Sequence, residues 1–130
     1  MQSVFVGLGA LCAFLGVGLG AFGAHALKAL LSAEMLAVYQ TGISYQMWHS
    51  VGLLLIGLLQ HQHPDSKPLS WAGWLMFIGI LLFSGSLYLL VILDSPRFGM
   101  ITPIGGVCFL LAWLLLCLSA YNNKPNKRYH

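Results

Sequence analysis

The residues of this chain that could do chemistry lie inside its hydrophobic runs, and residues 38–50 hold the densest group of them. This stretch carries Gln46 and His49 where a helix facing lipid would carry leucine. On a helix, Tyr45 and Gln46 share one side with His49, which follows them by four and three residues. A polar group inside a bilayer is costly and finds its partners in protein or water. This side of the helix is therefore predicted to face other helices.

The composition indicates that water is not the main solvent of the chain. Of its 130 residues, 58% are hydrophobic and only 7% are charged, whereas a soluble domain carries about 25% charged residues. The formal net charge of +3 is small and scattered, which argues against nucleic acid as a partner. Cys12, Cys108 and Cys117 sit in apolar runs without a Cys-x-x-Cys motif. We interpret them as small packing residues, because free cysteine behaves as a small hydrophobe.

Apolar runs of about 20 residues recur along the chain, and each is long enough to cross the hydrocarbon core of a bilayer. They predict an all-α polytopic membrane protein, a four-transmembrane-helix bundle with short loops. Residues 1–121 are expected to form a single domain, followed by a short basic tail at 122–130. Ser32 is expected to cap the helix that continues into the second span. The spans are predicted at about 4–24, 39–59, 71–93 and 100–120.

Small residues recur at spacings of three and four along the first span. The pattern Gly16-x-x-x-Gly20 lets another helix backbone approach closely, as is common in membrane helix pairs. Packing within the same bundle is favoured over a seam between two copies, although a homo-oligomer is also predicted from the extent of this face. The expected helix-packing positions are Gly9, Ala13, Gly16, Gly20 and Gly23, with Gly105 in the fourth span.

An even number of spans puts both termini on one side of the membrane. That side collects Lys67, Lys124, Lys127 and Arg128, and the other side has Lys28 and Arg97. Basic residues are enriched in cytoplasmic loops. We therefore expect cytoplasmic N- and C-termini.

Alternating helix directions place polar side chains of all four spans toward the leaflet opposite the termini. His49 lies about ten residues into its span, about 15 Å at 1.5 Å per residue, and so close to the bilayer midplane. The predicted cluster consists of His25, Tyr45, Gln46, His49, Ser84, Tyr88 and Thr102.

This cluster allows two interpretations of function. In one, the half of the bundle opposite the termini binds or passes a small ligand, an ion, a proton or a lipid headgroup, since ionisable residues inside membranes are functional candidates. In the other, the cluster only fixes the packing of a non-transporting structural or assembly subunit, whose partner is another membrane protein. No intramembrane carboxylate or nucleophilic cysteine accompanies His49, so no enzyme activity is predicted. His61-x-His63 lacks a third ligand, and neither a metal nor a cofactor is expected.

Four motifs in order along the chain resemble those of one family. They are Gly20-Ala-Phe-Gly-Ala-His25, Gln40-Thr-Gly-x-x-Tyr-Gln-x-x-His49, Leu82-Phe-Ser-Gly-Ser-Leu-Tyr88 and Thr102-Pro-x-Gly-Gly106. The chain is similar over nearly its whole length to the bacterial YgdD-like membrane proteins, whose animal counterpart is called transmembrane protein 256. The resemblance implies a four-span protein of the bacterial inner membrane. It implies no activity, substrate or cofactor, but its motifs coincide with the polar cluster.

Overall fold

The computed structural model describes residues 4–122, so the predicted basic tail lies outside the described residues except for Asn122. Its long helices are α1 (Val4–His25), α2 (Ala33–Gln62), α3 (Lys67–Gly79), α4 (Gly85–Leu93) and α5 (Thr102–Asn122). A π turn, η2 (Ile80–Ser84), joins α3 to α4 in one continuous span, and short 3₁₀ turns η1 (Leu27–Ala29) and η3 (Pro96–Met100) lie in the connections. Within residues 4–122 the structure has four helical segments long and apolar enough to cross a membrane. The predicted four-span, all-α fold class is confirmed.

Local sequence signals set where several of these helices begin and end. The Ser32 hydroxyl accepts a hydrogen bond from the Met35 N–H at 3.1 Å, so the predicted cap of α2 is confirmed. The Ser66 hydroxyl caps α3 in the same way, with Pro68 in the first turn, where a missing N–H is tolerated. Asp94 ends α4 in the left-handed conformation, with φ of 49°, which aspartate tolerates better than most residues.

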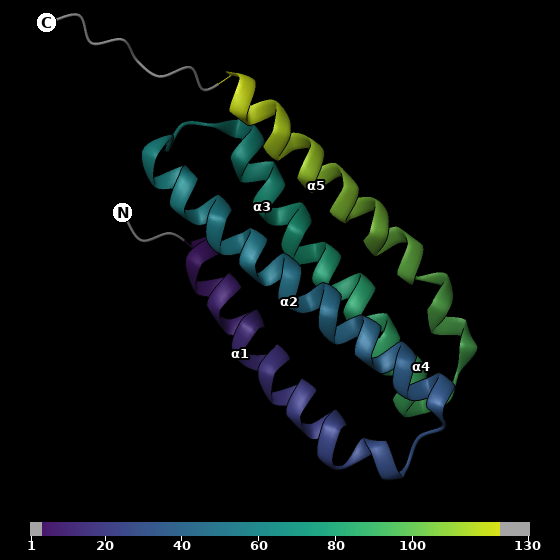
Figure 1. Cartoon of the computed structure of the whole chain (residues 1–130). Coiled ribbons are helices and arrows are strands. Elements are labelled where there is room, and N and C mark those ends of the chain that lie inside the picture. The colour runs from purple at the N-terminus through teal and green to yellow at the C-terminus, as the bar shows by residue number, and fades with distance from the viewer. Residues whose placement is uncertain (1–3, 123–130) are drawn as a thin grey trace, which may run out of the picture.

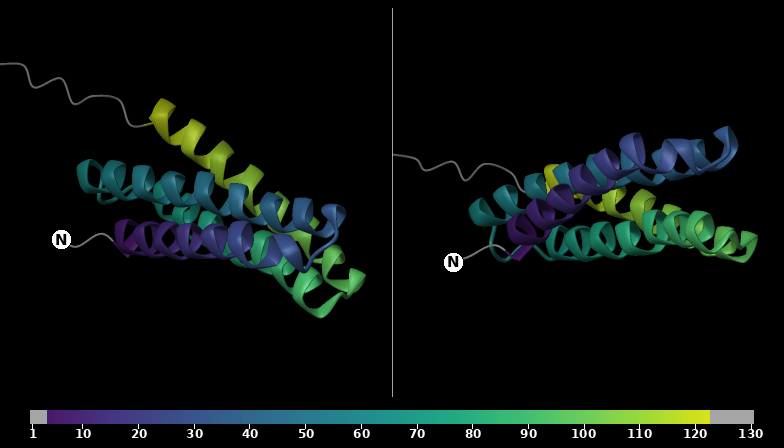
Figure 2. Two further views of the ribbon diagram at one scale, coloured as in Figure 1. Left: turned by 60° about the horizontal axis from the view of Figure 1, so that its bottom comes forward. Right: turned by 90° about the horizontal axis from the view of Figure 1, so that it is seen from below.

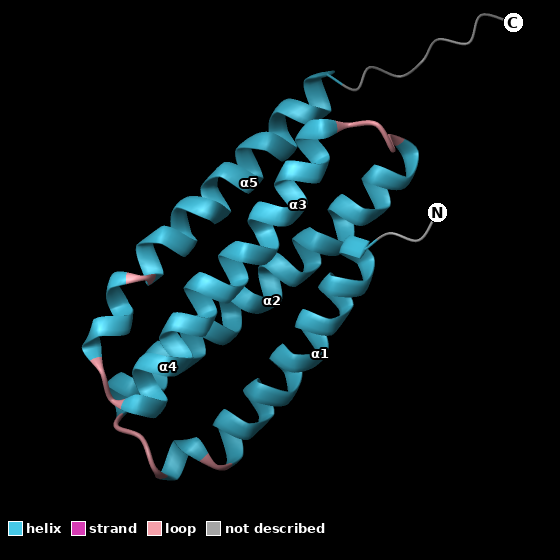
Figure 3. Cartoon of the chain, turned by 180° about the vertical axis from the view of Figure 1, so that it is seen from behind, coloured by secondary structure: helices cyan, strands magenta, loops and turns pink. Residues whose placement is uncertain are grey.

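The four spans lie side by side, with α2 and the α3–α4 segment in the middle and α1 and α5 on the flanks (Figure 1, Figure 2). Both ends of the described chain and the α2–α3 loop lie at one end of the bundle, and the other two connections lie at the opposite end (Figure 3). The flanking spans are little covered. Within their most apolar windows, 22% of residues in the first span and 17% in the fourth are buried, against 44% and 39% in the second and third.

Glycines let α1 approach α2 closely, and they account for most of the predicted stripe. A Cβ built on Gly9 would lie 2.8 Å from the Ser50 carbonyl oxygen, and one on Gly16 would lie 2.5 Å from the Met47 sulfur. Gly20 has a looser contact, 3.4 Å from Ile43.

The remaining small positions of the prediction divide between two settings. Gly23 lies against the Tyr39 ring, between α1 and α2. Ala13 instead is half-buried and lines a shallow hollow on the surface of α1 itself. On the other flank, Gly105 of α5 lies against the main chain of Phe83 in the π turn. An apolar core of fully buried residues includes Leu53, Ile56, Met76 and Ala112.

Candidate functional site

Gln46 lies at the centre of the polar cluster and ties three helices together. Its side chain is 5% exposed. Its Nε2 donates to the Cys12 carbonyl of α1 at 2.8 Å, and its Oε1 accepts a hydrogen bond from the Tyr88 hydroxyl of α4 at 2.6 Å. An amide both donates and accepts, so one side chain on α2 holds the helices on either side of it.

Two serines complete this network through main-chain carbonyls of α2. Ser84 donates to the Gly42 carbonyl at 2.7 Å, which joins the π turn to α2. Ser50 donates to the Gln46 carbonyl within its own helix at 2.6 Å. Gly42 also makes room for the Tyr88 ring, because a Cβ there would lie 2.7 Å from a ring carbon. The absence of a side chain at one position therefore decides where the tyrosine hydroxyl can reach.

The π turn η2 directs the serines of the third span to different neighbours. In this turn the Gly85 N–H bonds to the Ile80 carbonyl, five residues back, so the turn holds one residue more than an α turn. Ser84 faces α2, whereas Ser86 forms a 2.6 Å hydrogen bond with the Thr102 hydroxyl at the start of α5. The Ser86–Thr102 pair connects the third and fourth spans separately from the Gln46 network.

His49 is held by hydrogen bonds at both ring nitrogens. Nδ1 lies 2.6 Å from the Tyr45 carbonyl, and Nε2 lies 3.0 Å from Nε1 of Trp113 on α5. A carbonyl only accepts and an indole N–H only donates, so Nδ1 carries the hydrogen and Nε2 presents its lone pair. The ring stacks on Phe109 at 3.5 Å between centroids. The arrangement fits a neutral imidazole with both nitrogens in use.

A groove of about 500 Å³ runs beside this histidine, between α2 and α5. Its walls include the rings of Tyr45, Phe83 and Trp113, and Pro103 and Gly106 line its side on α5. Tyr45 is 43% exposed, and its hydroxyl has no hydrogen-bond partner among residues 4–122. The groove thus combines aromatic walls with one free hydroxyl.

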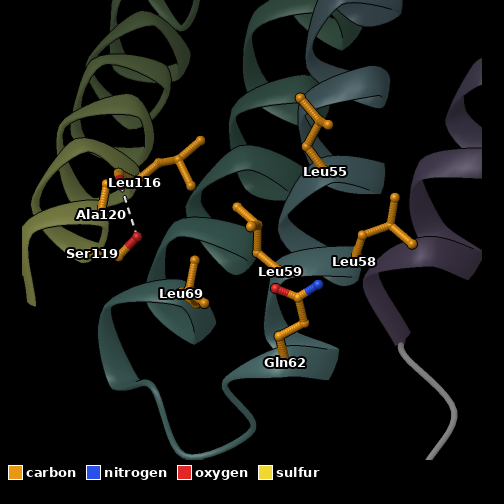
Figure 4. A pocket seen from close by; sticks show the side chains of 8 residues that line it. All are labelled: Leu55, Leu58, Leu59, Gln62, Leu69, Leu116, Ser119 and Ala120. Carbon is orange, nitrogen blue, oxygen red and sulfur yellow. Dashed lines mark hydrogen bonds between the residues drawn. The ribbon is translucent and has the colours of Figure 1, made fainter. Parts of the chain in front are cut away.

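A second hollow, of about 340 Å³, lies at the end of the bundle that holds the termini (Figure 4). Leucines of α2, α3 and α5 form most of its lining, and Gln62 and Ser119 are its polar members. The Ser119 hydroxyl bonds to the Leu116 carbonyl of its own helix at 2.7 Å. The lining contains no ionisable side chain, so this hollow offers space for an apolar chain and no acid–base chemistry.

The structure brings together part of the predicted cluster. Gln46, Ser84 and Tyr88 meet in one network, His49 lies beside it, and Thr102 pairs with Ser86. Tyr45 contributes its carbonyl and leaves its hydroxyl in the groove. His25 does not join the cluster: its side chain is exposed at the end of α1. Within residues 4–122, no three His, Cys, Asp or Glu side chains lie together as a metal site.

Sequence reasoning missed several partners of the cluster. Trp113, the donor to His49, lies in the middle of an apolar span, and an indole N–H at that depth was itself a signal that an acceptor lies nearby. Ser86, the partner of Thr102, had only its place in the Phe-Ser-Gly-Ser motif to mark it. The carbonyls of Cys12 and Gly42 carried no signal, because every residue has one.

The amino-acid sequence is similar to one protein-family model and to several membrane proteins. A family model described as "Protein of unknown function (DUF423)" matches residues 19–106. A UPF0382 membrane protein of Staphylococcus haemolyticus is 45% identical over 120 residues, 92% of this chain and 97% of the relative. One from Staphylococcus saprophyticus is 48% identical over 120 residues, with 92% and 98% covered.

YwdK, a UPF0382 membrane protein of Bacillus subtilis, is 45% identical over 119 residues, with 92% of this chain and 97% of the relative covered. No solved structure matches the chain. The inferred resemblance to a small membrane family without an assigned activity is confirmed.

Proposed function

Since the chain belongs to the DUF423 family of membrane proteins of unknown function, we propose from its geometry that it is a non-transporting structural or assembly subunit of the membrane. This proposal rests on one observation, that the hydrogen bonds of the buried polar network are complete. Among the described residues, no buried side-chain nitrogen or oxygen lacks a hydrogen-bond partner. A path for ions or protons needs polar groups that are free to exchange partners along its length. Because every buried group of this network is already bonded, the network is better suited to holding the helices together than to conducting ions or protons.

The flanking spans offer the surfaces through which such a subunit would meet its partner. Phe14 on α1 is 74% exposed and Leu110 on α5 is 71% exposed. Both lie on spans that the rest of the bundle covers little. The partner is another membrane protein, or a second copy of this chain, that packs on one of these faces.

The location that we propose is the bacterial inner membrane, with both termini in the cytoplasm. The proposal rests on the excess of basic residues at the end that holds the termini. Reporter fusions after Lys67 and at the C-terminus should then report the cytoplasm, and a fusion at Asp94 should report the opposite side. A periplasmic signal from the C-terminal fusion would contradict this orientation.

Reconstituted vesicles test the absence of transport. We expect proton and ion flux through vesicles with the wild-type protein to equal that through empty vesicles, and His49→Gln to change nothing. A flux that depends on protein and is altered in a stably folded His49→Gln variant would overturn the proposal.

Crosslinking in living cells tests the partner. Photoreactive residues at positions 14 and 110 should yield a protein adduct on at least one of the two faces. Lipid adducts alone at both positions would refute the assembly role.

A second candidate function, binding of a small ligand, is supported by the groove beside His49. A flat, largely apolar molecule with one hydrogen-bonding group would stack against the rings of Tyr45 and Phe83 and bond to the free Tyr45 hydroxyl. Tyr45→Phe removes that hydroxyl and keeps the ring. Mass spectrometry of small molecules that co-purify with each protein would then show a species in the wild type that the variant lacks. Identical spectra would exclude this function.

A further inference from the structure

A separate hollow of about 290 Å³ lies between α1 and α2, near the end of the bundle opposite the termini. On the α1 side it is bordered by the small residues Gly20, Gly23 and Ala24, and the Tyr39 ring of α2 lies against Gly23. On the α2 side it is bordered by Gln40 and Ser44, which both point away from the bundle centre and are exposed. The hollow is therefore a recess with polar groups on one wall and small residues on the other.

The recess extends inward from near the edge of the hydrocarbon core. His49 lies near the middle of α2, and the nine residues back to Gln40 correspond to about 13 Å at 1.5 Å per residue. Ser44 lies about 7 Å from the same level. Half of a typical hydrocarbon core is about 15 Å thick, so Gln40 lies just inside its boundary. Because side chains on a helix point toward its N-terminus, the Gln40 amide is directed to that boundary.

The polar groups of the recess have no partner within the protein. Neither the Gln40 amide nor the Ser44 hydroxyl makes a hydrogen bond to another residue in the range 4–122. Thr41, on the same exposed face, is different, because its hydroxyl donates to the Ala37 carbonyl at 3.0 Å. Unbonded polar groups in hydrocarbon are costly. Gln40 and Ser44 therefore require acceptors that come from outside the chain at this depth.

We propose that the recess binds a diacyl glycerophospholipid of the leaflet opposite the termini, with Gln40 and Ser44 donating hydrogen bonds to its ester carbonyls. The ester groups of such lipids lie at the boundary between headgroups and hydrocarbon, at the level of the Gln40 amide. Ser44 lies one turn deeper, with its hydroxyl directed toward the same level. One acyl chain lies in the recess beside Gly20 and Ala24. A helix of a second protein fits less well, because Trp48 projects from the same face one turn deeper and is 73% exposed, whereas close helix pairs need small residues.

The proposed hydrogen bonds recognise the ester bonds that join the acyl chains to glycerol, and they do not involve the headgroup. Ester carbonyls are common to all diacyl lipids, and the ether oxygens of dialkyl lipids are poor acceptors. The first experiment therefore uses the wild-type protein alone. Purified protein in detergent is mixed with diacyl phosphatidylglycerol or with its dialkyl ether analogue, and native mass spectrometry measures the fraction that carries one lipid. We expect retention of the ether lipid to be roughly sevenfold lower, the loss expected for two hydrogen bonds in a membrane.

Matched variants test the two donors. Gln40→Met combined with Ser44→Ala should lower retention of the diacyl lipid by the same factor and abolish the preference for ester over ether. Thr41→Val removes a hydroxyl from the same face and should leave both unchanged, because that hydroxyl is bonded within its own helix. Equal retention of ester and ether lipids by the wild type would overturn the proposal. So would a wild-type dimer that the double variant converts to a monomer, since the face would then be an interface between copies.

Discussion

The hydrogen bond between Gln46 and Tyr88 allows a direct test of the idea that the polar cluster locks the bundle. Gln46→Leu replaces the amide with an apolar group of similar size, and Tyr88→Phe removes only the hydroxyl. The first change deprives both the Cys12 carbonyl and the Tyr88 hydroxyl of a partner, and the second leaves Gln46 Oε1 without a donor. The double variant removes both members of the bond at once.

The geometry sets the size of the expected effects. Hydrogen bonds between membrane helices average about 0.6 kcal/mol and reach about 1.7 kcal/mol. The bond between Tyr88 and Gln46 is short, at 2.6 Å, and Gln46 is only 5% exposed, which favours the upper part of that range. Gln46→Leu breaks two bonds and should cost about 2–3 kcal/mol, and Tyr88→Phe about 1 kcal/mol. Because one bond is common to both changes, the double variant should cost about 1 kcal/mol less than the sum.

Reversible unfolding in mixed detergent and lipid micelles measures these free energies of unfolding. The control cycle pairs Gln46→Leu with Ser86→Ala, which affects the separate pair with Thr102, and its effects should add within about 0.5 kcal/mol. If the Gln46–Tyr88 cycle is equally additive, the bond does not lock the helices and the argument for a structural cluster fails.

Further predictions concern the contacts of α5. Gly105→Ala should lower the free energy of unfolding by about 1–3 kcal/mol, because its Cβ would lie 2.8 Å from the Phe83 Cα. Gly106→Ala is the control and should be tolerated, since its Cβ would lie 4.0 Å from the same residue's ring; equal losses would contradict the close approach. His49→Gln should be tolerated because an amide also donates and accepts, whereas His49→Leu should cost about 1–3 kcal/mol by leaving the Trp113 N–H unbonded. Thermal unfolding in detergent measures each change, and equal stability of the two His49 variants would refute the second prediction.

The fold was predictable from the sequence because its strongest signals are physical requirements of a membrane. A chain in hydrocarbon must satisfy its backbone within helices, so apolar runs of sufficient length determine how often the chain crosses. The cap at Ser32 was predictable because only a few side chains can bond to the free N–H groups of a first helical turn. The similar levels of Gln46, Ser84 and Tyr88 were predictable, since antiparallel spans of known length place these residues in the same half of the bundle.

The details of the cluster were not predictable, because they depend on helix rotation and on main-chain partners. Depth puts His25 on the same side of the membrane as the cluster, but rotation and its position at the end of α1 leave it exposed. The π turn rotates Ser84 relative to the start of its span. The sequence around Ile80 contains no proline from which this turn could have been predicted. The carbonyls of Cys12 and Gly42 bond to side chains because close helix packing brings them near, which only the three-dimensional structure reveals.

The polar groups of the membrane-spanning helices separate into two sets according to what they face. Those that face protein, with Gln46 and His49 as the main examples, have a protein partner for every buried polar atom of their side chains. The second set faces outward: Gln40, Ser44 and the Tyr45 hydroxyl make no hydrogen bond within residues 4–122, and they lie on the exposed side of α2 in the half of the bundle opposite the termini. A bundle stabilised by the first set gains nothing for its own packing from the second, and each unbonded group at that depth has a cost. Selection for folding alone would replace them with apolar residues, so their presence directs the search for function to the lipid-facing surface and away from the bundle interior.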